Sequence, residues 1–209
     1  MNNSPFPEGD SIVLWAKTLQ FANMEEQNRL DLFPAGKLRV TLLRLCHQLM
    51  EHYGEFDDTV MLGLQPRGIF VGRRIKEVLQ QLKPGLDIPY GELDVTFFRD
   101  DFRKRDTPLA ANQTKVDFLI EDRRVILVDD VLYTGRTIRA AMDAMLAYGR
   151  PRSVELLALV DRQHERELPI EPSYVGISVD TIETQRVKVE LKESGGGDQV
   201  WLVSNPKTE

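Results

Sequence analysis

The chain has 209 residues, of which 42% are hydrophobic and 29% charged, and these proportions are typical of one globular domain with a sizeable core. The formal net charge of −6 disfavours broad, non-specific binding to nucleic acid, although a local basic patch can still exist on an acidic protein. The longest apolar runs are far shorter than the roughly 18 residues of a membrane span, and the chain shows no basic segment followed by an apolar leader. We therefore expect a cytoplasmic protein without membrane contact.

The first 36 residues are expected to form an N-terminal arm, and residues 37–209 a single main domain. The arm contains an apolar patch at residues 12–21, so it should pack on the body of the protein or on a neighbouring molecule. Residues 37–53 carry apolar side chains at helical spacing, which predicts an amphipathic helix. Cys46 lies within this pattern, and as the single cysteine of the chain it is interpreted as a core residue rather than as a disulfide or metal-binding residue.

A short apolar strand is predicted at residues 59–64, followed by a helix that ends at Pro84-Gly85. Between them lies the turn Gln65-Pro66-Arg67-Gly68. Loops at the carboxyl ends of parallel strands form the binding crevice of an open α/β sheet, so Arg67 is expected to face that crevice and meet an anion. The alternative interpretation is a surface arginine at the start of a helix.

A further strand is predicted at residues 93–98, and a long polar connection follows it to Thr114. Such a connection is uncommon inside a compact domain and is often a lid over a binding site. Arg103, Lys104 and Arg105 would then neutralise an anion, while a solvated run of charges is an equally weighted alternative.

The most informative stretch is residues 125–137, which read VILVDDVLYTGRT. Its first four residues form an uninterrupted apolar run, as expected for a strand buried on both faces of a parallel sheet. Asp129 and Asp130 follow, and then a loop with two threonines and Gly135 opens a helix. Backbone N–H groups and the positive end of the helix dipole make such a loop a phosphate site.

Carboxylates next to a phosphate site need a reason, because the anion repels them. Vicinal sugar hydroxyls or a bound Mg²⁺ supply one. Phosphate together with a diol indicates a ribose 5-phosphate. The alternative interpretation of Asp129 and Asp130 is a helix N-cap with a favourable dipole charge.

After the motif, apolar residues at helical spacing predict a helix that closes at Gly149 and Pro151. Residues 153–160 read as another buried strand, and residues 186–191 and 199–203 alternate around a glycine-rich turn as a β-hairpin does. The repeated order of strand and helix predicts an α/β fold with an open, mostly parallel twisted sheet flanked by helices, a small hood and a C-terminal β-hairpin.

Residues 125–137 resemble the phosphoribosyl pyrophosphate (PRPP) signature of type I phosphoribosyltransferases, from the hydrophobic run to the final threonine. The resemblance implies catalytic roles for Asp129, Asp130 and Arg67, and pyrophosphate binding by Gln65, Arg67 and Gly68. It implies a lid that includes Arg99, Asp100 and Arg103, and Mg²⁺ carried by PRPP without a dedicated cage of protein ligands. The residues implied to bind the ribose and 5-phosphate are Asp129, Asp130, Leu132, Tyr133, Thr134, Gly135, Arg136 and Thr137.

Residues 38–189 further resemble the bifunctional pyrimidine-operon attenuator and uracil phosphoribosyltransferase (PyrR) family. The resemblance rests on several short runs, among them GELD at 91–94, FRDD at 98–101, LVDR at 159–162 and ELPI at 167–170. It implies transfer of phosphoribose from PRPP to uracil, giving UMP and pyrophosphate, with Asp161 and Arg162 in the base hood. It also implies a homodimer or higher homo-oligomer and binding to an mRNA leader.

The chain departs from the family pattern in three places. One acidic residue is added within residues 163–169, and residues 176–182 lack the lysine and proline of the family; both changes fall in the hood. Leu43 replaces a threonine that the family associates with RNA contact, next to Arg44 and His47, which together with Arg152 are candidates for an RNA face. The alternatives are a transferase for another base, an RNA-binding attenuator with little or no transferase activity, and a nucleotide sensor that turns over no base.

Overall fold

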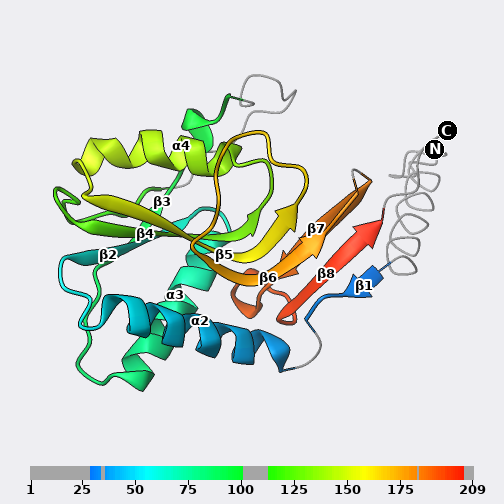
Figure 1. Ribbon diagram of the computed structural model, residues 1–209, viewed down its shortest axis with the longest axis horizontal. Coiled ribbons are helices and arrows are strands. Elements are labelled where there is room, and N and C mark those ends of the chain that lie inside the picture. The colour runs from blue at the N-terminus through cyan, green and yellow to red at the C-terminus, as the bar shows by residue number, and fades with distance from the viewer. Residues whose placement is uncertain (1–28, 34–35, 101–112, 183, 205–209) are drawn as a thin grey trace, which may run out of the picture.

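The computed structural model describes residues 29–33, 36–100, 113–182 and 184–204. Figure 1 shows a sheet with helices on both faces and a smaller sheet beside it. Within the described ranges, none of the helices combines the length and the apolar character that crossing a bilayer requires. The apolar patch at residues 12–21 and the lid residues Arg103, Lys104 and Arg105 lie outside the described residues.

Five parallel strands form the main sheet in the order β3-β2-β4-β5-β6. Their bounds are β2 (Thr59–Leu64), β3 (Tyr90–Leu93), β4 (Arg124–Leu132), β5 (Ser153–Gln163) and β6 (Tyr174–Asp180). The strand at the centre is β4, and its residues Val125 to Val128 are buried, because helices cover both faces of the sheet. The parallel α/β fold is therefore confirmed.

Three helices cover the main sheet: α2 (Lys37–Tyr53) and α3 (Gly68–Leu82) lie on one face and α4 (Arg136–Met145) on the other (Figure 1). Alternate strand residues point to opposite faces, so Ile126 and Val128 pack in the core with α2 and α3, whereas Val125 and Leu127 pack with α4. Cys46 lies in the first core, and burial raises the pKa of its thiol to about 12.

The smaller sheet is antiparallel and has the order β1-β8-β7. The predicted hairpin corresponds to β7 (Gln185–Glu190) and β8 (Gln199–Ser204), joined by a 3₁₀ turn at Lys192–Ser194. The short strand β1 (Arg29–Asp31) pairs with β8 and was not predicted. Apolar residues of β7 and β8 belong to the core that contains α2 and α3, so the two sheets share one interior.

The strand predicted at residues 93–98 is wrong in its extent. Strand β3 ends at Leu93, and Thr96–Phe98 form a 3₁₀ turn. The Asp94 carboxylate accepts hydrogen bonds from the backbone N–H and the hydroxyl of Thr96 at 2.9 and 2.6 Å, which turns the chain immediately after the strand. The apolar pattern was misleading because Phe97 and Phe98 are exposed rather than buried.

Candidate functional site

The carboxyl ends of β2, β4 and β5 surround a pocket of about 230 Å³. Most of its lining comes from residues that the sequence had singled out: Arg67, Arg99, Asp129, Leu132, Tyr133, Thr134, Gly135, Thr137 and Arg162. Val187 on β7 contributes to the same lining, which places the smaller sheet at the edge of the pocket. A larger hollow of about 510 Å³ lies between α2, α3 and the turn before β8, away from the end of β4.

Asp129 and Asp130 are both 6% exposed at the end of β4. The carboxylate of Asp129 accepts a hydrogen bond from the backbone N–H of Asp130 at 3.0 Å. Burial and, secondarily, the negative charge of Asp130 raise the pKa of Asp129 well above its ordinary value. Two carboxylates are thus held together at a site that disfavours charging both, unless a cation or hydroxyl donors compensate.

Arg67 lies directly opposite this acidic pair, and its Nε donates to Oδ2 of Asp130 at 2.5 Å. The preceding peptide bond between Gln65 and Pro66 is cis, and the Gln65 side chain donates to the backbone carbonyl of Gln113 at 2.8 Å. A Cβ at Gly68 would lie only 2.5 Å from the carbonyl oxygen of Val128. The first turn of α3 can therefore approach the end of β4 only because residue 68 is glycine.

The loop that precedes α4 has the geometry of a phosphate cradle. Gly135 has a φ of 91°, a left-handed conformation that favours glycine, and α4 begins at the next residue. The first backbone N–H groups of a helix have no partner within it; that of Arg136 donates to the Thr134 hydroxyl at 3.4 Å, which leaves those of Thr137 and Ile138 as donors for an anion. The hydroxyl of Thr137 on this turn accepts a hydrogen bond from Nη1 of Arg99 at 2.9 Å.

Arg136 does not line the pocket but ties neighbouring segments to the phosphate loop. Its guanidinium pairs with Asp100, a residue of the predicted lid, at 2.5 Å, and with Glu167 from the segment after β5. The backbone N–H of Glu167 also donates to the carbonyl of Thr134 at 3.1 Å. Asp100 of the predicted lid and Glu167 after β5 are therefore both bonded to the loop before α4 or to the first residue of α4.

The predicted hood residues make a network that covers the other side of the pocket. Arg162 is 5% exposed, and its guanidinium stacks 3.8 Å from the ring centroid of Tyr133. Glu165 accepts hydrogen bonds from the Tyr133 hydroxyl and from Arg162. Asp161 is paired with Arg166, whose guanidinium also donates to the backbone carbonyl of Tyr133.

Sequence reasoning did not assign Glu165, Arg166 and Thr181 to this network. Thr181 entered the sequence analysis only as part of the altered segment at residues 176–182. Glu165 did carry a signal, because the family pattern has one acidic residue fewer in this region. Its contacts with Tyr133 and Thr181 span 32 and 16 positions of sequence and could not be inferred from spacing.

The comparisons with known proteins agree with this geometry. The phosphoribosyl transferase domain matches residues 41–194. The bifunctional protein pyrR of Enterococcus faecalis is 43% identical over 172 residues, which cover 82% of this chain and 95% of that protein. The pyrimidine operon regulatory protein of Lactococcus lactis is 44% identical over 165 residues, which cover 79% of this chain and 91% of that protein.

The chain belongs to the bifunctional PyrR family of phosphoribosyltransferases. The predicted family is thereby confirmed, and with it a PRPP-dependent pentosyltransferase in a family that regulates pyrimidine operons. Among solved structures, the hypoxanthine phosphoribosyltransferase of Trypanosoma cruzi has a TM-score of 0.64 at 13% identity, covering 84% of this chain and 97% of that chain. At this identity the likeness concerns the fold alone.

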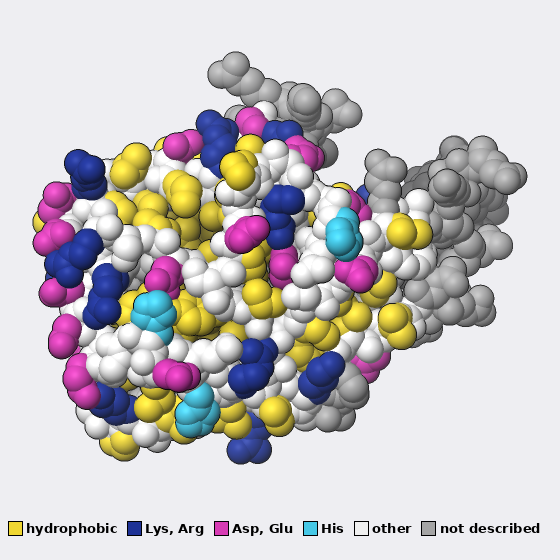
Figure 2. All heavy atoms as spheres, in the orientation of Figure 1, with side chains coloured by type: hydrophobic (Ala, Val, Ile, Leu, Met, Phe, Trp, Pro, Cys, Tyr) yellow, Lys and Arg dark blue, Asp and Glu magenta, His cyan; other side chains and the backbone are white. Residues whose placement is uncertain are grey.

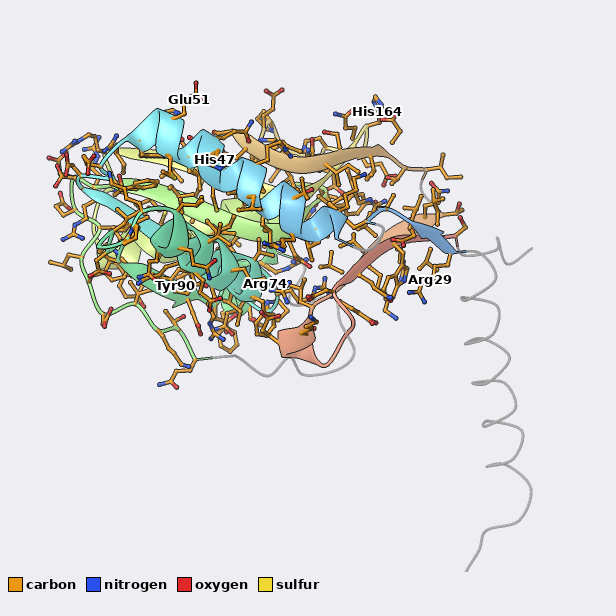
Figure 3. The ribbon with its side chains drawn as sticks, turned by 90° about the horizontal axis from the view of Figure 1, so that it is seen from below. Arg29, His47, Glu51, Arg74, Tyr90 and His164 are labelled. Carbon is orange, nitrogen blue, oxygen red and sulfur yellow. The ribbon has the colours of Figure 1, made fainter. Side chains whose placement is uncertain are left out.

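The residues that the PyrR resemblance suggested for RNA contact are all exposed, and two of them, Arg44 and Arg152, are bonded to other parts of the protein. Arg44 on α2 donates to the carbonyls of Val175 and Gly176 on β6 at 2.8 and 2.6 Å. His47 lies one turn along α2 (Figure 3), whereas Arg152, the residue before β5, pairs with Asp122, which lies just before β4. On the face shown in Figure 2, Lys and Arg side chains lie among Asp and Glu side chains.

A metal centre built only from protein side chains has no candidate in the described part of the chain, where no three His, Cys, Asp or Glu residues are grouped for one. The carboxylates of Asp129 and Asp130 do supply oxygen atoms of the kind that Mg²⁺ prefers. The donor set at the end of β4 is thus compatible with a Mg²⁺ ion that takes its remaining ligands from a bound phosphate compound and water.

Proposed function

We propose that the protein transfers the phosphoribosyl group of PRPP to uracil, giving UMP and pyrophosphate. The observation that carries this proposal is the single pocket that brings together the phosphate loop, Asp129, Arg67 and Arg162. A phosphate cradle, a carboxylate beside it and a cation opposite match the 5-phosphate, the ribose hydroxyls and the pyrophosphate of one PRPP molecule. The names of the relatives support a pyrimidine base.

We assign the 5-phosphate to the loop that contains Thr134, Gly135 and Thr137, and the ribose hydroxyls to Asp129 and Asp130. Arg67, with Gln65 and Gly68 around it, would bind the pyrophosphate. Because Arg67 is paired with Asp130, binding of PRPP would exchange this carboxylate for a pyrophosphate oxygen and leave Asp130 to accept a ribose hydroxyl. Mg²⁺ carried by PRPP would add positive charge at the pyrophosphate when it is bound.

The reaction replaces the bond between the anomeric carbon and pyrophosphate by a bond to N1 of uracil, which loses its proton. A transition state of this kind places positive charge on the ribose ring, so positioning and electrostatic stabilisation matter more than a strong nucleophile. The carboxylates of Asp129 and Asp130 would favour the charge on the ribose. Arg67 and Arg99 would favour the negative charge that develops on the leaving group, and the hood with Asp161 and Arg162 would hold the base.

The test is release of pyrophosphate from PRPP and Mg²⁺ with uracil, hypoxanthine, guanine, orotate or no base. We expect release with uracil alone. An Asp130→Asn variant should lose at least about two orders of magnitude in kcat, because charge stabilisation in such sites is worth that much. Release of pyrophosphate with a purine only would show that the substrate is a purine and not uracil. Binding of PRPP without release of pyrophosphate for any base would show that the protein is a sensor.

Regulatory RNA binding is the second candidate function, supported by the name pyrimidine operon regulatory protein of the Lactococcus lactis relative. The assay is binding to a pyrimidine-operon leader RNA at increasing salt, with and without UMP. Phosphate contacts would make the affinity fall steeply as salt rises. An Arg152→Ala variant should weaken binding, and the absence of binding at low salt under both conditions would remove this function.

We further propose that the protein acts in the cytoplasm as a homodimer or higher homo-oligomer. The buried free thiol of Cys46 is compatible with a reducing compartment. Light scattering coupled to size exclusion measures the assembly directly, and a monomer at micromolar concentration would contradict this part of the proposal.

A further inference from the structure

Glu165 is the acidic residue that this chain has in addition to the family pattern, and it is placed within the hood. Its side chain is only 17% exposed. It accepts hydrogen bonds from the Tyr133 hydroxyl, from Nη2 of Arg162 at 3.4 Å and from the Thr181 hydroxyl at 3.4 Å. Arg162 is its cationic partner, and the two opposite charges compensate each other in this largely buried position.

Arg162 is the part of this network that faces the pocket. Its Nε donates to Thr181 at 3.1 Å, and its Nη2 donates to the carbonyl of Gln185 at 3.0 Å as well as to Glu165. The guanidinium of Arg162 lines the pocket, and its N–H groups are hydrogen-bond donors. A carbonyl oxygen of a pyrimidine is a suitable acceptor for them.

The charges around this end of the pocket are arranged in pairs. Arg162 is paired with Glu165, and Arg166 with Asp161. Without Glu165, the buried guanidinium of Arg162 would present an uncompensated positive charge to the base. In a site of low dielectric, such a charge attracts an anionic ligand strongly.

We propose that Glu165 is a specificity-determining residue that keeps the base end of the pocket electrically neutral. The pocket then takes a neutral pyrimidine and rejects a pyrimidine that carries a carboxylate. Glu165 acts through Arg162 and is a positioning residue rather than a catalytic one. The inference rests on the proposed transfer to uracil.

The experiment measures inhibition of uracil turnover by uracil derivatives with a carboxylate or a carboxamide at C5 or C6. Carboxylate and carboxamide have nearly the same shape and differ in charge, so the ratio of their inhibition constants reports the charge of the pocket. In Glu165→Gln we expect inhibition by the carboxylate, relative to the carboxamide, to become stronger by at least about tenfold than in the wild type. Glutamine keeps the size of the side chain and an oxygen that can accept from Tyr133. The substitution therefore removes the charge while keeping the position of the side chain, and a change in the ratio reports the charge.

Charge-matched controls separate this effect from a general change in net charge. Glu171→Gln removes an exposed carboxylate from the same segment and should leave the ratio unchanged. The double variant Glu165→Gln with Arg162→Gln removes both members of the pair, so the ratio should return towards that of the wild type. If Glu165→Gln does not fold, Arg162→Gln alone is compared with the wild type and should increase rejection of the carboxylate by a similar factor.

An unchanged ratio in folded Glu165→Gln, or in Arg162→Gln where that variant replaces it, would overturn the inference. Equal binding of carboxylate and carboxamide by the wild type would overturn it as well. These outcomes differ from failure of the proposed function, in which the wild type releases no pyrophosphate with uracil. That result would remove both proposals, whereas an active wild type with unchanged ratios removes only the role of Glu165.

Discussion

Asp129 illustrates the conflict between stability and function at the scale of one residue. Its carboxyl group is buried beside Asp130, and both the burial and the neighbouring charge raise its pKa. The folded protein therefore holds this proton more tightly than the unfolded chain does. The stability that follows is present below the ordinary pKa of 3.8 and is lost as the pH rises through the raised value.

Replacing Asp129 by asparagine should therefore stabilise the protein at neutral and alkaline pH. Asparagine has nearly the same shape, keeps an oxygen that accepts from the backbone N–H of Asp130, and never ionises. We expect a melting temperature at least about 3 °C above the wild type at pH 8 and little difference near pH 4. Uracil turnover should be lost, because this position is assigned to the ribose.

Differential scanning calorimetry at both pH values measures this effect, with Asp87→Asn as the control. The Asp87 side chain is 86% exposed and should respond little at either pH. A melting temperature of Asp129→Asn that falls at pH 8 would show that the charged carboxylate contributes to folding instead of opposing it.

At the scale of elements, Glu155 on β5 joins α2 to β6. Its Oε2 accepts hydrogen bonds from the hydroxyls of Tyr53 on α2 and Tyr174 on β6, both at 2.7 Å. Both tyrosines are 6% exposed, and burial, followed by the hydrogen bond to Glu155, raises the pKa of each. One carboxylate thus satisfies two hydroxyls on elements that are far apart in the sequence.

Glu155→Ala should lower the free energy of unfolding by about 2 kcal/mol, because it leaves two largely buried hydroxyls without their acceptor. Urea denaturation measures the change. Glu51→Ala is the matched control, since Glu51 is an exposed residue of α2 (Figure 3) and should change the free energy by less than about 0.5 kcal/mol. Equal effects of the two variants would contradict the bridging role of Glu155.

The contact between α3 and β4 depends on Gly68. A Cβ at this position would lie 2.5 Å from the carbonyl oxygen of Val128 and 3.0 Å from Cα of Asp129, both backbone atoms that cannot move aside cheaply. Gly68→Ala should therefore push the first turn of α3, with Arg67, away from the end of β4. We expect kcat/KM for PRPP to fall at least about tenfold, since small displacements of positioning groups have effects of this size.

Steady-state kinetics with varied PRPP checks this prediction. Gly197→Ala serves as the control, because a Cβ there would meet its nearest neighbour at an ordinary 3.5 Å. Unchanged kinetics in Gly68→Ala would mean that the loop tolerates the shift and that Arg67 is not positioned by this contact.

Elements with strong local signals could be predicted from the sequence, and elements that depend on distant partners could not. The run at residues 125–137 carries its strand, loop and helix start within thirteen positions, so this order followed from pattern alone, although β4 continues through Asp129 and Asp130 to Leu132. The strand predicted through Phe98 failed because one hydrogen-bonding side chain, Asp94, outweighs the apolar character of the residues that follow. Strand β1 has only three residues, which is too short for a periodic signal. Its pairing partner β8 lies at the other end of the chain, so the pairing could not be predicted either.

The same distinction applies to the candidate site. Arg67, Asp129 and Arg162 reach one pocket because each lies at or just after the carboxyl-terminal part of a parallel strand, which topology alone predicts. The ion pair between Arg67 and Asp130 and the contacts of Glu165 depend on side-chain positions in segments that are far apart in the sequence or in separate turns and strands. Those contacts became visible only in three dimensions.

At the scale of the whole molecule, the described end of the N-terminal arm is part of the body. Leu32 and Phe33 both donate their backbone N–H to the carbonyl of Val200, at 2.8 and 3.2 Å. Phe33 is 2% exposed and packs in the core shared by α2, α3 and the smaller sheet. Since Val187 of that sheet lines the pocket, the arm contributes indirectly to the wall of the site.

Phe33→Ala should therefore destabilise the protein by about 3 kcal/mol, the usual cost of removing a buried aromatic side chain without refilling its space. Leu30→Ala removes a side chain that is 61% exposed on the neighbouring strand β1, and we expect less than about 0.5 kcal/mol. Urea denaturation followed by far-ultraviolet circular dichroism gives both values. Because the smaller sheet borders the pocket, Phe33→Ala should also raise the KM for uracil at temperatures where the protein remains folded. If Phe33→Ala were as stable as Leu30→Ala, the arm and the body would fold independently. The core next to β8 would then be stable without the Phe33 side chain.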